Sequence, residues 1–308
     1  MTLEISPPIS VATAYSPSHI TGFYSEVKDE SILNRGSLGA GISIKKGVKS
    51  TIELYNSERN NYIIRINGII SKDAIVSKFV INEFLKKAKK NYFLKVNHEV
   101  EVPIGYGIGT SGSGALSLSY ALNDALSLGL SDIETAQIAH NAEIQCKTGL
   151  GTVLSEFYGG FCIRTKGGAP GIGKTTVIKL NNCKVAIFCF SPVFTQYFIQ
   201  GIRRISNDDC HKMMLKVLKT EKIIDFLDLS YRFSQGLGFA NRTCNNLMNL
   251  LSQNGFQSSL ALFGQTVFTV VKENELKVIK EISKNFAARL FISEIENKGV
   301  RLTKKDET

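Results

Sequence analysis

A glycine-rich run at residues 103–115, PIGYGIGTSGSGA, constrains this chain more than any other stretch. It begins at Pro103 and combines glycines with hydroxyl side chains: Gly105, Gly107, Gly109, Thr110, Ser111, Gly112, Ser113 and Gly114. Glycine lets the backbone turn tightly and approach a ligand closely, because it has no Cβ atom. A helix-compatible run, ALSLSYALNDALSLG, follows at once, so unpaired N–H groups and the helix dipole converge on one spot. This combination favours a phosphate-binding loop over a flexible surface loop.

Length and composition indicate a two-domain globular enzyme. The chain has 308 residues, 43% of them hydrophobic and 21% charged, and we expect domains at 1–176 and 177–308. It contains no apolar run of the roughly 20 residues that a membrane helix needs, and no signal-peptide pattern, so we expect a cytoplasmic protein without a membrane partner. The six cysteines form no C-x-x-C pair and are expected to be free thiols.

The net charge of +10 is spread along the whole sequence. No aromatic RNA-binding motif or zinc finger accompanies the basic residues, so we expect no nucleic-acid partner. We expect instead a generally positive surface that attracts anionic small molecules.

The N-terminal part alternates strand and helix patterns. Residues 9–24 predict a strand that runs into Pro17, followed by a turn that carries Ser18, His19, Thr21 and Gly22. A histidine among hydroxyls and a glycine suits a binding site, and a structural role is the equal alternative. Period-two alternation predicts antiparallel strands at 36–44, 48–55 and 62–68.

Three helices and a further strand are predicted next. Apolar spacing indicates an amphipathic helix at 71–90, and residues 92–102 read as a strand. The helix after the glycine run is expected at 113–128. Ser131 and Glu134 have capping-box spacing and open another helix that extends to 147. Glu143 near its end is either a solvent-facing residue or, beside a phosphate loop, a magnesium ligand.

A second glycine-rich piece at 168–175, GAPGIGKT, fits the P-loop pattern G-x-x-x-x-G-K-[ST]. A P-loop needs a helix N-terminus behind it. Here the β-branched run TTVIKL, an Asn181-Asn182 turn and the run CKVAIFCF follow, which predict a hairpin. We therefore interpret the match as a coincidence, although Lys174 can still contact an anionic substrate.

The C-terminal part predicts helices at 206–219, 221–235 and 241–253. A strand at 259–271, a helix at 273–284 and a strand at 288–295 follow. Strand, helix and strand at the end indicate a ferredoxin-like α+β layer.

Several strings together resemble the GHMP kinase superfamily. They are SPSHITG at 16–22, the glycine run at 103–115, AE at 142–143 before TGLG at 148–151, the pair Gly159-Gly160, and GQTVF at 264–268. Longer strings, such as AYSPSHITGFY at 14–24 and IAHNAE at 138–143, are most similar to archaeal pantoate kinases. The similarity spans most of residues 10–270.

The resemblance implies an α+β fold with an N-terminal domain like ribosomal protein S5 domain 2 and a ferredoxin-like C-terminal domain. ATP and pantoate would bind between them, with the glycine run around the phosphates and Mg²⁺ at Ser111 and Glu143. His19 stands where many members carry a lysine, and with Ser18, Thr21 and Gly22 it would face the substrate. Phosphorylation of pantoate to 4-phosphopantoate serves coenzyme A synthesis, and family members often form homodimers.

One departure from the family pattern concerns the catalytic base. Many members carry an aspartate eight residues before Gly160, where this chain has Thr152. A threonine hydroxyl is not a base near neutral pH, but positioning and charge neutralisation provide most of the acceleration in phosphoryl transfer. Glu156, one helical turn further on, is a candidate substitute if this segment is helical. The alternatives are a related kinase for mevalonate, homoserine or shikimate, a catalytically impaired nucleotide-binding homologue, or a P-loop NTPase that uses Lys174.

Overall fold

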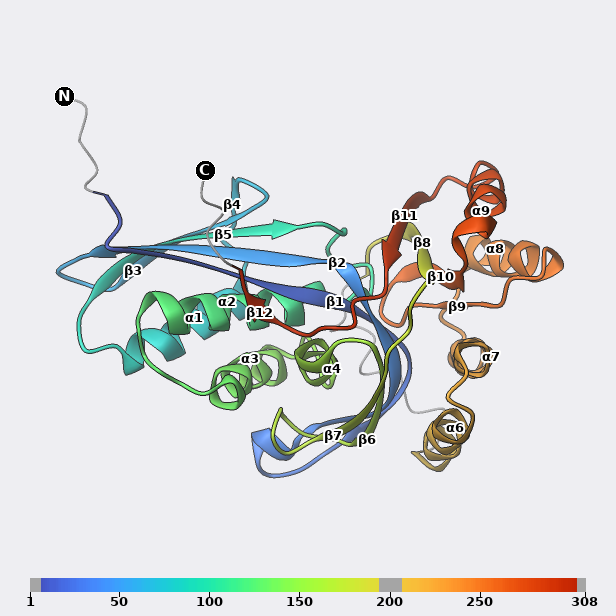
Figure 1. Ribbon diagram of the computed structural model, residues 1–308, viewed down its shortest axis with the longest axis horizontal. Coiled ribbons are helices and arrows are strands. Elements are labelled where there is room, and N and C mark those ends of the chain that lie inside the picture. Colours follow the sequence, from blue (N-terminus) through green and yellow to red (C-terminus); the bar gives the residue numbers. More distant parts are fainter. Residues whose placement is uncertain (1–6, 194–206, 304–308) are drawn as a thin grey trace.

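A computed structural model describes residues 7–193 and 207–303 of the chain. Two β-sheets organise it, a large one with helices on one face and a smaller one beside it (Figure 1). Among the described helices, none combines the length and apolar character needed to cross a bilayer. All six cysteines are free thiols, and four of them are buried.

The large sheet has eight strands in the order β12-β1-β2-β5-β3-β4, and β6 and β7 extend it from β2. The strands are β1 (Ser10–Val27), β2 (Gly36–Asn56), β3 (Asn61–Ile66), β4 (Ile69–Ile70), β5 (Tyr92–Val100), β6 (Phe161–Lys166), β7 (Lys174–Ile178) and β12 (Arg301–Leu302). The antiparallel pair of β1 and β2 is central to this sheet, because one part of β2 pairs with β5 and another part pairs with β6.

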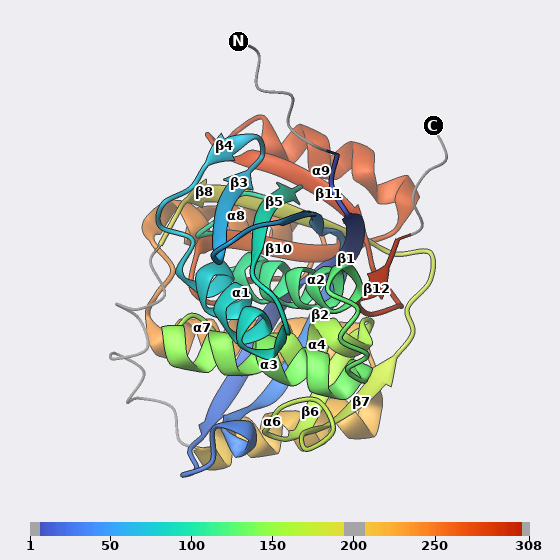
Figure 2. The same ribbon diagram turned by 90° about the vertical axis from the view of Figure 1, so that its left-hand side faces the viewer.

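Four helices cover one face of this sheet (Figure 1). They are α1 (Ile75–Lys87), α2 (Thr110–Ala125), α3 (Asp132–Cys146) and α4 (Thr152–Tyr158), and a short 3-10 helix, η1 (Ile32–Asn34), precedes β2. Figure 2 shows α1, α2 and α3 side by side under the strands. Buried apolar residues such as Ile52, Phe84, Leu94 and Leu116 form the core between helices and sheet. The predicted capping box is present, since Ser131 and Glu134 exchange hydrogen bonds at the start of α3.

The small sheet is antiparallel with the order β11-β8-β10-β9. Its strands are β8 (Lys184–Ser191), β9 (Ser258–Leu260), β10 (Gln265–Val271) and β11 (Arg289–Glu294). The accompanying helices are α6 (Asn207–Thr220), α7 (Ile223–Leu237), α8 (Arg242–Gln253), η3 (Glu273–Glu275) and α9 (Leu276–Ser283). In chain order the strands are fourth, first, third and second across the sheet, which is the ferredoxin-like arrangement. The predicted α+β class and the ferredoxin-like sheet of the C-terminal part are thereby confirmed.

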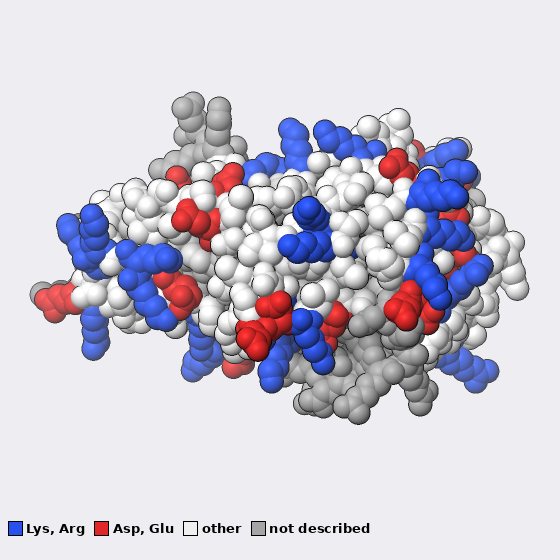
Figure 3. All heavy atoms as spheres, turned by 90° about the horizontal axis from the view of Figure 1, so that it is seen from below, with Lys and Arg blue, Asp and Glu red and all other residues white. Residues whose placement is uncertain are grey.

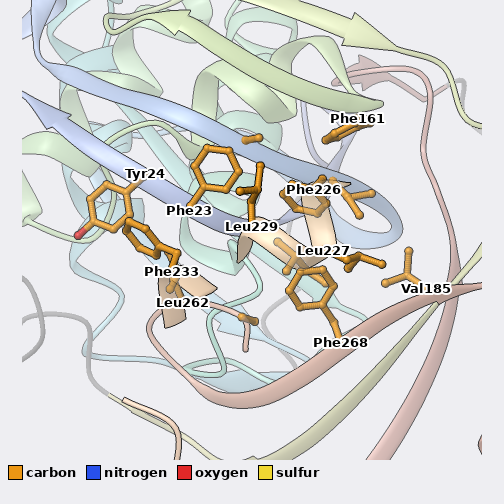
Figure 4. Close-up of a cluster of buried hydrophobic side chains, with 14 of the residues drawn as sticks. Phe23, Tyr24, Phe161, Val185, Phe226, Leu227, Leu229, Phe233, Leu262 and Phe268 are labelled. Carbon is orange, nitrogen blue, oxygen red and sulfur yellow. The ribbon is translucent and has the colours of Figure 1, made fainter. Parts of the chain in front are cut away.

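An aromatic cluster packs the two sheets together through α7 (Figure 4). The ring of Phe226 on α7 lies 5.0 Å from the ring of Phe161 on β6 and 6.2 Å from the rings of Phe23 on β1 and Phe268 on β10. Buried aromatic side chains of this size contribute strongly to stability. The cluster therefore holds the elements of both sheets around a common region.

The last described segment returns from the small sheet to the large one. Glu296 donates its backbone N–H to the carbonyl of Ser43, Val300 donates to the carbonyl of Glu156 on α4, and β12 pairs with β1 (Figure 1). The boundary expected at residues 176 and 177 falls inside β7 of the large sheet. The division into 1–176 and 177–308 stays a prediction.

Three expectations about strands are wrong. The turn at Ser18–Gly22 is absent, because β1 continues through Pro17 and irregularities in its pairing with β2 absorb the proline and the glycine. Strands β7 and β8 do not form a hairpin, since β7 pairs with β6 and β8 pairs with β10 and β11. Strand β3 pairs with β5 in parallel, and only β4 pairs with it antiparallel.

Basic side chains are spread over the face seen in Figure 3, with acidic side chains among them. This distribution agrees with a generally positive surface on that face and not with a single basic stripe.

Candidate active site

A cavity of about 720 Å³ lies where the two sheets meet. Its lining includes residues of β1 and β2, the glycine run, the loop before α4 and the turn that connects β9 and β10. Residues singled out by the sequence and found in this lining are His19, Thr21, Gly105, Gly107, Gly109, Thr110, Ser111, Gly114 and Thr152. A concave site of this size with a few polar groups suits a small-molecule ligand.

The glycine run forms the loop that leads into α2. Gly105, Gly107 and Gly109 all have positive φ angles, of 86°, 73° and 70°. A Cβ atom on Gly107 would lie only 2.3 Å from the carbonyl oxygen of Leu262, so the loop also needs glycine to pack against the turn after β9. Because α2 begins at Thr110, its first-turn N–H groups and its dipole are directed to the cavity end of the helix. This arrangement can bind an anion such as a phosphate.

Ser111 and Glu143 are brought together beside this loop. The Ser111 hydroxyl donates a hydrogen bond of 3.1 Å to Oε2 of Glu143, and the Thr148 hydroxyl donates one of 2.7 Å to Oε1. Burial raises the pKa of Glu143 to about 7, while these two hydrogen bonds act in the opposite direction. A hydroxyl and a single carboxylate next to a phosphate seat are the oxygen ligands that Mg²⁺ prefers.

Thr152 and Glu156 lie one turn apart on α4 but face different surroundings. Thr152 lines the cavity, whereas Glu156 is fully buried behind the glycine run. Ser113 donates its hydroxyl hydrogen to Oε1 of Glu156 at 3.0 Å, and Oε2 has no hydrogen-bond partner among the described residues. Burial, and secondarily the charge of Glu143, raises the pKa of Glu156 well above its ordinary value. Burial thus favours the neutral form of the Glu156 carboxyl.

A buried arginine that the sequence did not single out also lines the cavity. Arg164 on β6 is 1% exposed and lines the cavity together with His19 and Ser37. Its NH1 nitrogen donates to the hydroxyl of Ser155 at 2.8 Å and to Nε2 of His19 at 3.3 Å. Among the described residues, no carboxylate forms an ion pair with Arg164, and its Nε has no hydrogen-bond partner.

A buried guanidinium without a counter-charge is costly, and burial lowers the pKa of Arg164 to about 10. At this pKa the side chain is still cationic near neutral pH. Such a group suits an anionic ligand, because the fork of guanidinium donors matches a carboxylate or a phosphate.

The loop before α4 is shaped to this arginine. A Cβ atom on Gly151 would lie 2.2 Å from the Ser37 hydroxyl oxygen and 2.9 Å from Nε of Arg164. Glycine at this position therefore brings the backbone against both side chains. The one signal in the sequence was a charged residue inside the short apolar strand FCIRT at 161–165.

Several expected site residues lie outside the cavity lining. Ser18 and Gly22 are covered within the protein: the Ser18 hydroxyl oxygen is buried 3.4 Å from that of Ser113, and Gly22 packs under Ser230 and Phe226 of α7. Pro103, Gly112 and Ser113 support the glycine loop without lining the cavity.

Lys174 is exposed at the start of β7, and a strand follows the second glycine-rich piece in place of a helix. The structure therefore does not bring Lys174 to the cavity.

Comparisons with known proteins agree with this architecture. The sequence profile of the GHMP kinases N terminal domain matches residues 74–160. The chain is 31% identical over 278 residues to the pantoate kinase of Methanocaldococcus jannaschii, covering 88% of this chain and 97% of that protein. It is 29% identical over 291 residues to the pantoate kinase of Thermococcus kodakarensis, covering 92% of this chain and 95% of that protein.

Solved structures give the same result. A phosphotransferase related to the CoA biosynthesis pathway superposes with a TM-score of 0.88 at 26% identity, over 96% of this chain and all of that chain. The mevalonate diphosphate decarboxylase of Enterococcus faecalis shares the fold at 16% identity, with a TM-score of 0.74 over 96% of this chain and 99% of that chain. The chain belongs to the GHMP kinase superfamily and, within it, to the family of the pantoate kinases.

Proposed function

We propose that this protein transfers the γ-phosphoryl group of ATP to pantoate, forming 4-phosphopantoate and ADP as a step of coenzyme A biosynthesis. The observation that carries the proposal is the buried Arg164, which has no acidic partner in the described structure and shares one cavity with the glycine loop. A glycine loop that can bind phosphate and a buried cation that can bind a carboxylate line the same cavity, which fits a carboxylate-bearing alcohol as the substrate. The relatives named pantoate kinase support the same substrate.

The triphosphate would lie against the N–H groups at the start of α2. The loop amides and the helix dipole bind and orient it, and Ser111 and Glu143 would hold Mg²⁺ there. When bound, the ion neutralises charge on the phosphate oxygens. Thr148 fixes the orientation of the Glu143 carboxylate through its 2.7 Å hydrogen bond.

Pantoate would bind with its carboxylate on Arg164 and its terminal hydroxyl toward the glycine loop. The hydroxyl oxygen forms a bond to the γ-phosphorus while the bond between this phosphorus and ADP breaks, and the hydroxyl proton is released. The packing of Gly151 against Ser37 and Arg164 closes the carboxylate end. Holding both reactants in line accounts for a large part of the acceleration.

We propose that this transfer needs no carboxylate base. Thr152 occupies the usual position of the aspartate and cannot serve as one. Glu156 is buried behind the loop, outside the cavity lining, and burial raises the pKa of its carboxyl well above the ordinary value. In phosphoryl transfer, positioning and electrostatic stabilisation provide most of the rate.

The test is a product analysis by mass spectrometry with ATP, Mg²⁺ and pantoate, beside a panel of mevalonate, homoserine and shikimate. We expect 4-phosphopantoate and stoichiometric ADP from pantoate. A preference for another alcohol, or tight ATP binding without any phosphorylated product, would overturn the assignment.

A matched analogue and a variant test the carboxylate seat. The diol 2,2-dimethylpropane-1,3-diol has the dimethyl group and hydroxyls of pantoate but no carboxylate, so we expect it to be a much poorer substrate. The ratio of kcat/KM for pantoate to kcat/KM for the diol should fall by about tenfold or more in Arg164→Gln, because a charge-assisted hydrogen bond to the carboxylate is lost.

A further inference from the structure

The two ring nitrogens of His19 have different partners inside the protein. His19 on β1 is 1% exposed. Its Nδ1 lies 3.2 Å from the hydroxyl oxygen of Ser43 on β2, and its Nε2 lies 3.3 Å from NH1 of Arg164 on β6. Both nitrogens are therefore engaged, and three strands contribute to one chain of hydrogen bonds.

Chemistry decides which nitrogen carries the proton. A guanidinium group can only donate hydrogen bonds, so Nε2 of His19 must accept from Arg164. The proton is then on Nδ1, which donates to the Ser43 hydroxyl, and that hydroxyl donates to the carbonyl of Ser155 at 3.5 Å. Burial first, and the charge of Arg164 second, hold the pKa of His19 well below 6.5, so the ring stays neutral.

The contact fixes one side of the guanidinium. NH1 of Arg164 is held by two acceptors, His19 Nε2 and the Ser155 hydroxyl. The Nε on the other edge is unpaired and buried against Gly151 and Ser37. Arg164, Gly151 and Ser37 all line the cavity. An arginine locked on one edge presents its remaining donors in a single orientation, which improves recognition of a planar carboxylate.

From this geometry we infer that His19 is a positioning residue for substrate binding: the neutral ring accepts a hydrogen bond from Arg164 and orients that guanidinium toward the substrate carboxylate. The inference rests on the proposed function. It assigns His19 neither proton transfer nor direct contact with phosphate, although many superfamily members carry a lysine there.

Gly41 on β2 shows that the fold makes room for this ring. A Cβ atom at Gly41 would lie 2.3 Å from Nε2 of His19, 2.4 Å from the backbone carbonyl oxygen of Ile20 and 2.8 Å from Cε1 of His19. An alanine at this position must displace the imidazole and also shift the backbone of β1, and it removes no polar group. Gly41→Ala is therefore a second but coarser perturbation of the same contact.

Two amide substitutions at His19 distinguish its hydrogen bond with Arg164 from its hydrogen bond with Ser43. In His19→Gln the side-chain oxygen can replace Nε2 as the acceptor for Arg164. In His19→Asn the shorter amide can replace Nδ1 toward Ser43 but leaves Arg164 without its acceptor. We expect His19→Asn and Gly41→Ala to raise the KM for pantoate by about tenfold, the size of one lost hydrogen bond, and His19→Gln to raise it less. The KM for ATP and the kcat at saturating pantoate should change little.

A double-mutant cycle shows whether His19 acts through Arg164. In the Arg164→Gln background, His19→Asn should have no further effect on the KM for pantoate. Additive effects in the two backgrounds, or a large loss of kcat with an unchanged KM, would overturn the inference, and so would an unchanged KM in folded His19→Asn and Gly41→Ala proteins. Circular dichroism of each variant confirms folding.

The wild-type product assay keeps the two proposals apart. If the wild type phosphorylates pantoate and the variants show no KM effect, the inference fails and the function stands. If the wild type prefers another carboxylate-bearing alcohol, the substrate assignment fails, and the same KM pattern measured with that alcohol supports the role of His19.

Discussion

Ser111 on α2 and Glu143 on α3 lie 32 residues apart in the sequence, yet the Ser111 hydroxyl donates a hydrogen bond of 3.1 Å to the Glu143 carboxylate. If the pair holds Mg²⁺ as proposed, Glu143→Gln should lower kcat by about a hundredfold and raise the Mg²⁺ concentration for half-maximal rate, because an ionic ligand worth several kcal/mol is lost. Steady-state kinetics over a Mg²⁺ series measure both effects. The exposed Gln145 on the same helix provides the control, Gln145→Ala. An unchanged Mg²⁺ dependence in Glu143→Gln would contradict the metal assignment.

Two glycines of α2 should respond in opposite ways to alanine. A Cβ atom on Gly112 would lie 2.6 Å from Oε2 of the buried Glu156, whereas one on Gly114 would meet nothing within 4 Å. We expect Gly112→Ala to destabilise the protein by about 1–3 kcal/mol through overpacking. Gly114→Ala should stabilise it by up to about 1 kcal/mol, because alanine favours a helix. Melting temperatures without ligand test this, and equal shifts in the two variants would argue against the packing described.

The lysine of the P-loop-like sequence should be dispensable. Lys174 is exposed and begins a strand, so Lys174→Ala should change the KM for ATP by no more than about twofold, as for an ordinary surface substitution. Ser111→Ala should raise that KM by about tenfold through a lost hydrogen-bonding group. Nucleotide titrations of both variants give the comparison. The reverse order of effects would assign the triphosphate to the second glycine-rich piece.

Glu156→Gln should leave kcat within about threefold of the wild type, because Glu156 is buried outside the cavity lining and the amide oxygen of glutamine keeps an acceptor for Ser113. A positioned general base contributes about 10²–10⁴-fold, so its loss would be obvious in a single-turnover rate. A fall of that size in a folded Glu156→Gln protein would make Glu156 the missing base.

His98 should make the fold sensitive to acid. Both of its ring nitrogens contact serine hydroxyls, Ser50 at 2.8 Å and Ser77 at 3.1 Å, and burial lowers its pKa from 6.5 to about 4. Between these two values the unfolded chain binds a proton that the folded protein does not, so stability falls as the pH falls from 6.5 to 4. The full effect of such a shift is about 3 kcal/mol.

His98→Gln removes this titration. In urea titrations, the stability advantage of the wild type over His98→Gln should therefore be smaller at pH 4.5 than at pH 7. All other titrating groups are common to both proteins, so their effects on the unfolding free energy cancel in the difference. His211→Gln, at an exposed position on α6, should leave the difference unchanged. A difference independent of pH would mean that His98 titrates alike in both states.

Local signals predicted much of the fold correctly. Glycines followed by a helix pattern located the loop and α2, and the capping box located the start of α3. Partner choice between strands was less predictable, because it depends on contacts between distant segments. The turn at Asn181-Asn182 looks like a hairpin locally, yet β7 and β8 belong to different sheets.

The candidate active site also combines residues that the sequence predicted with one that it did not. Gly107, Ser111 and Thr152 follow from motif positions, and all line the cavity. Glu143 follows from its motif position too, but it is buried behind Ser111 and outside the lining. Arg164 was missed because a strand pattern says which face a residue occupies and not what it meets there. Its lack of an acidic partner in the described structure becomes visible only when β1, β2 and β6 are assembled.

The return of the last strand to β1 affects how a newly made chain can fold. β12 completes one edge of the large sheet, and the segment before it bonds to the backbone of α4, whose first turn lines the cavity. A nascent polypeptide on the ribosome has all the phosphate-loop residues long before it has this strand. The large sheet can therefore reach its final form only after residues 301 and 302 have been synthesised, and a chain that stops before residue 301 leaves β1 without this edge partner.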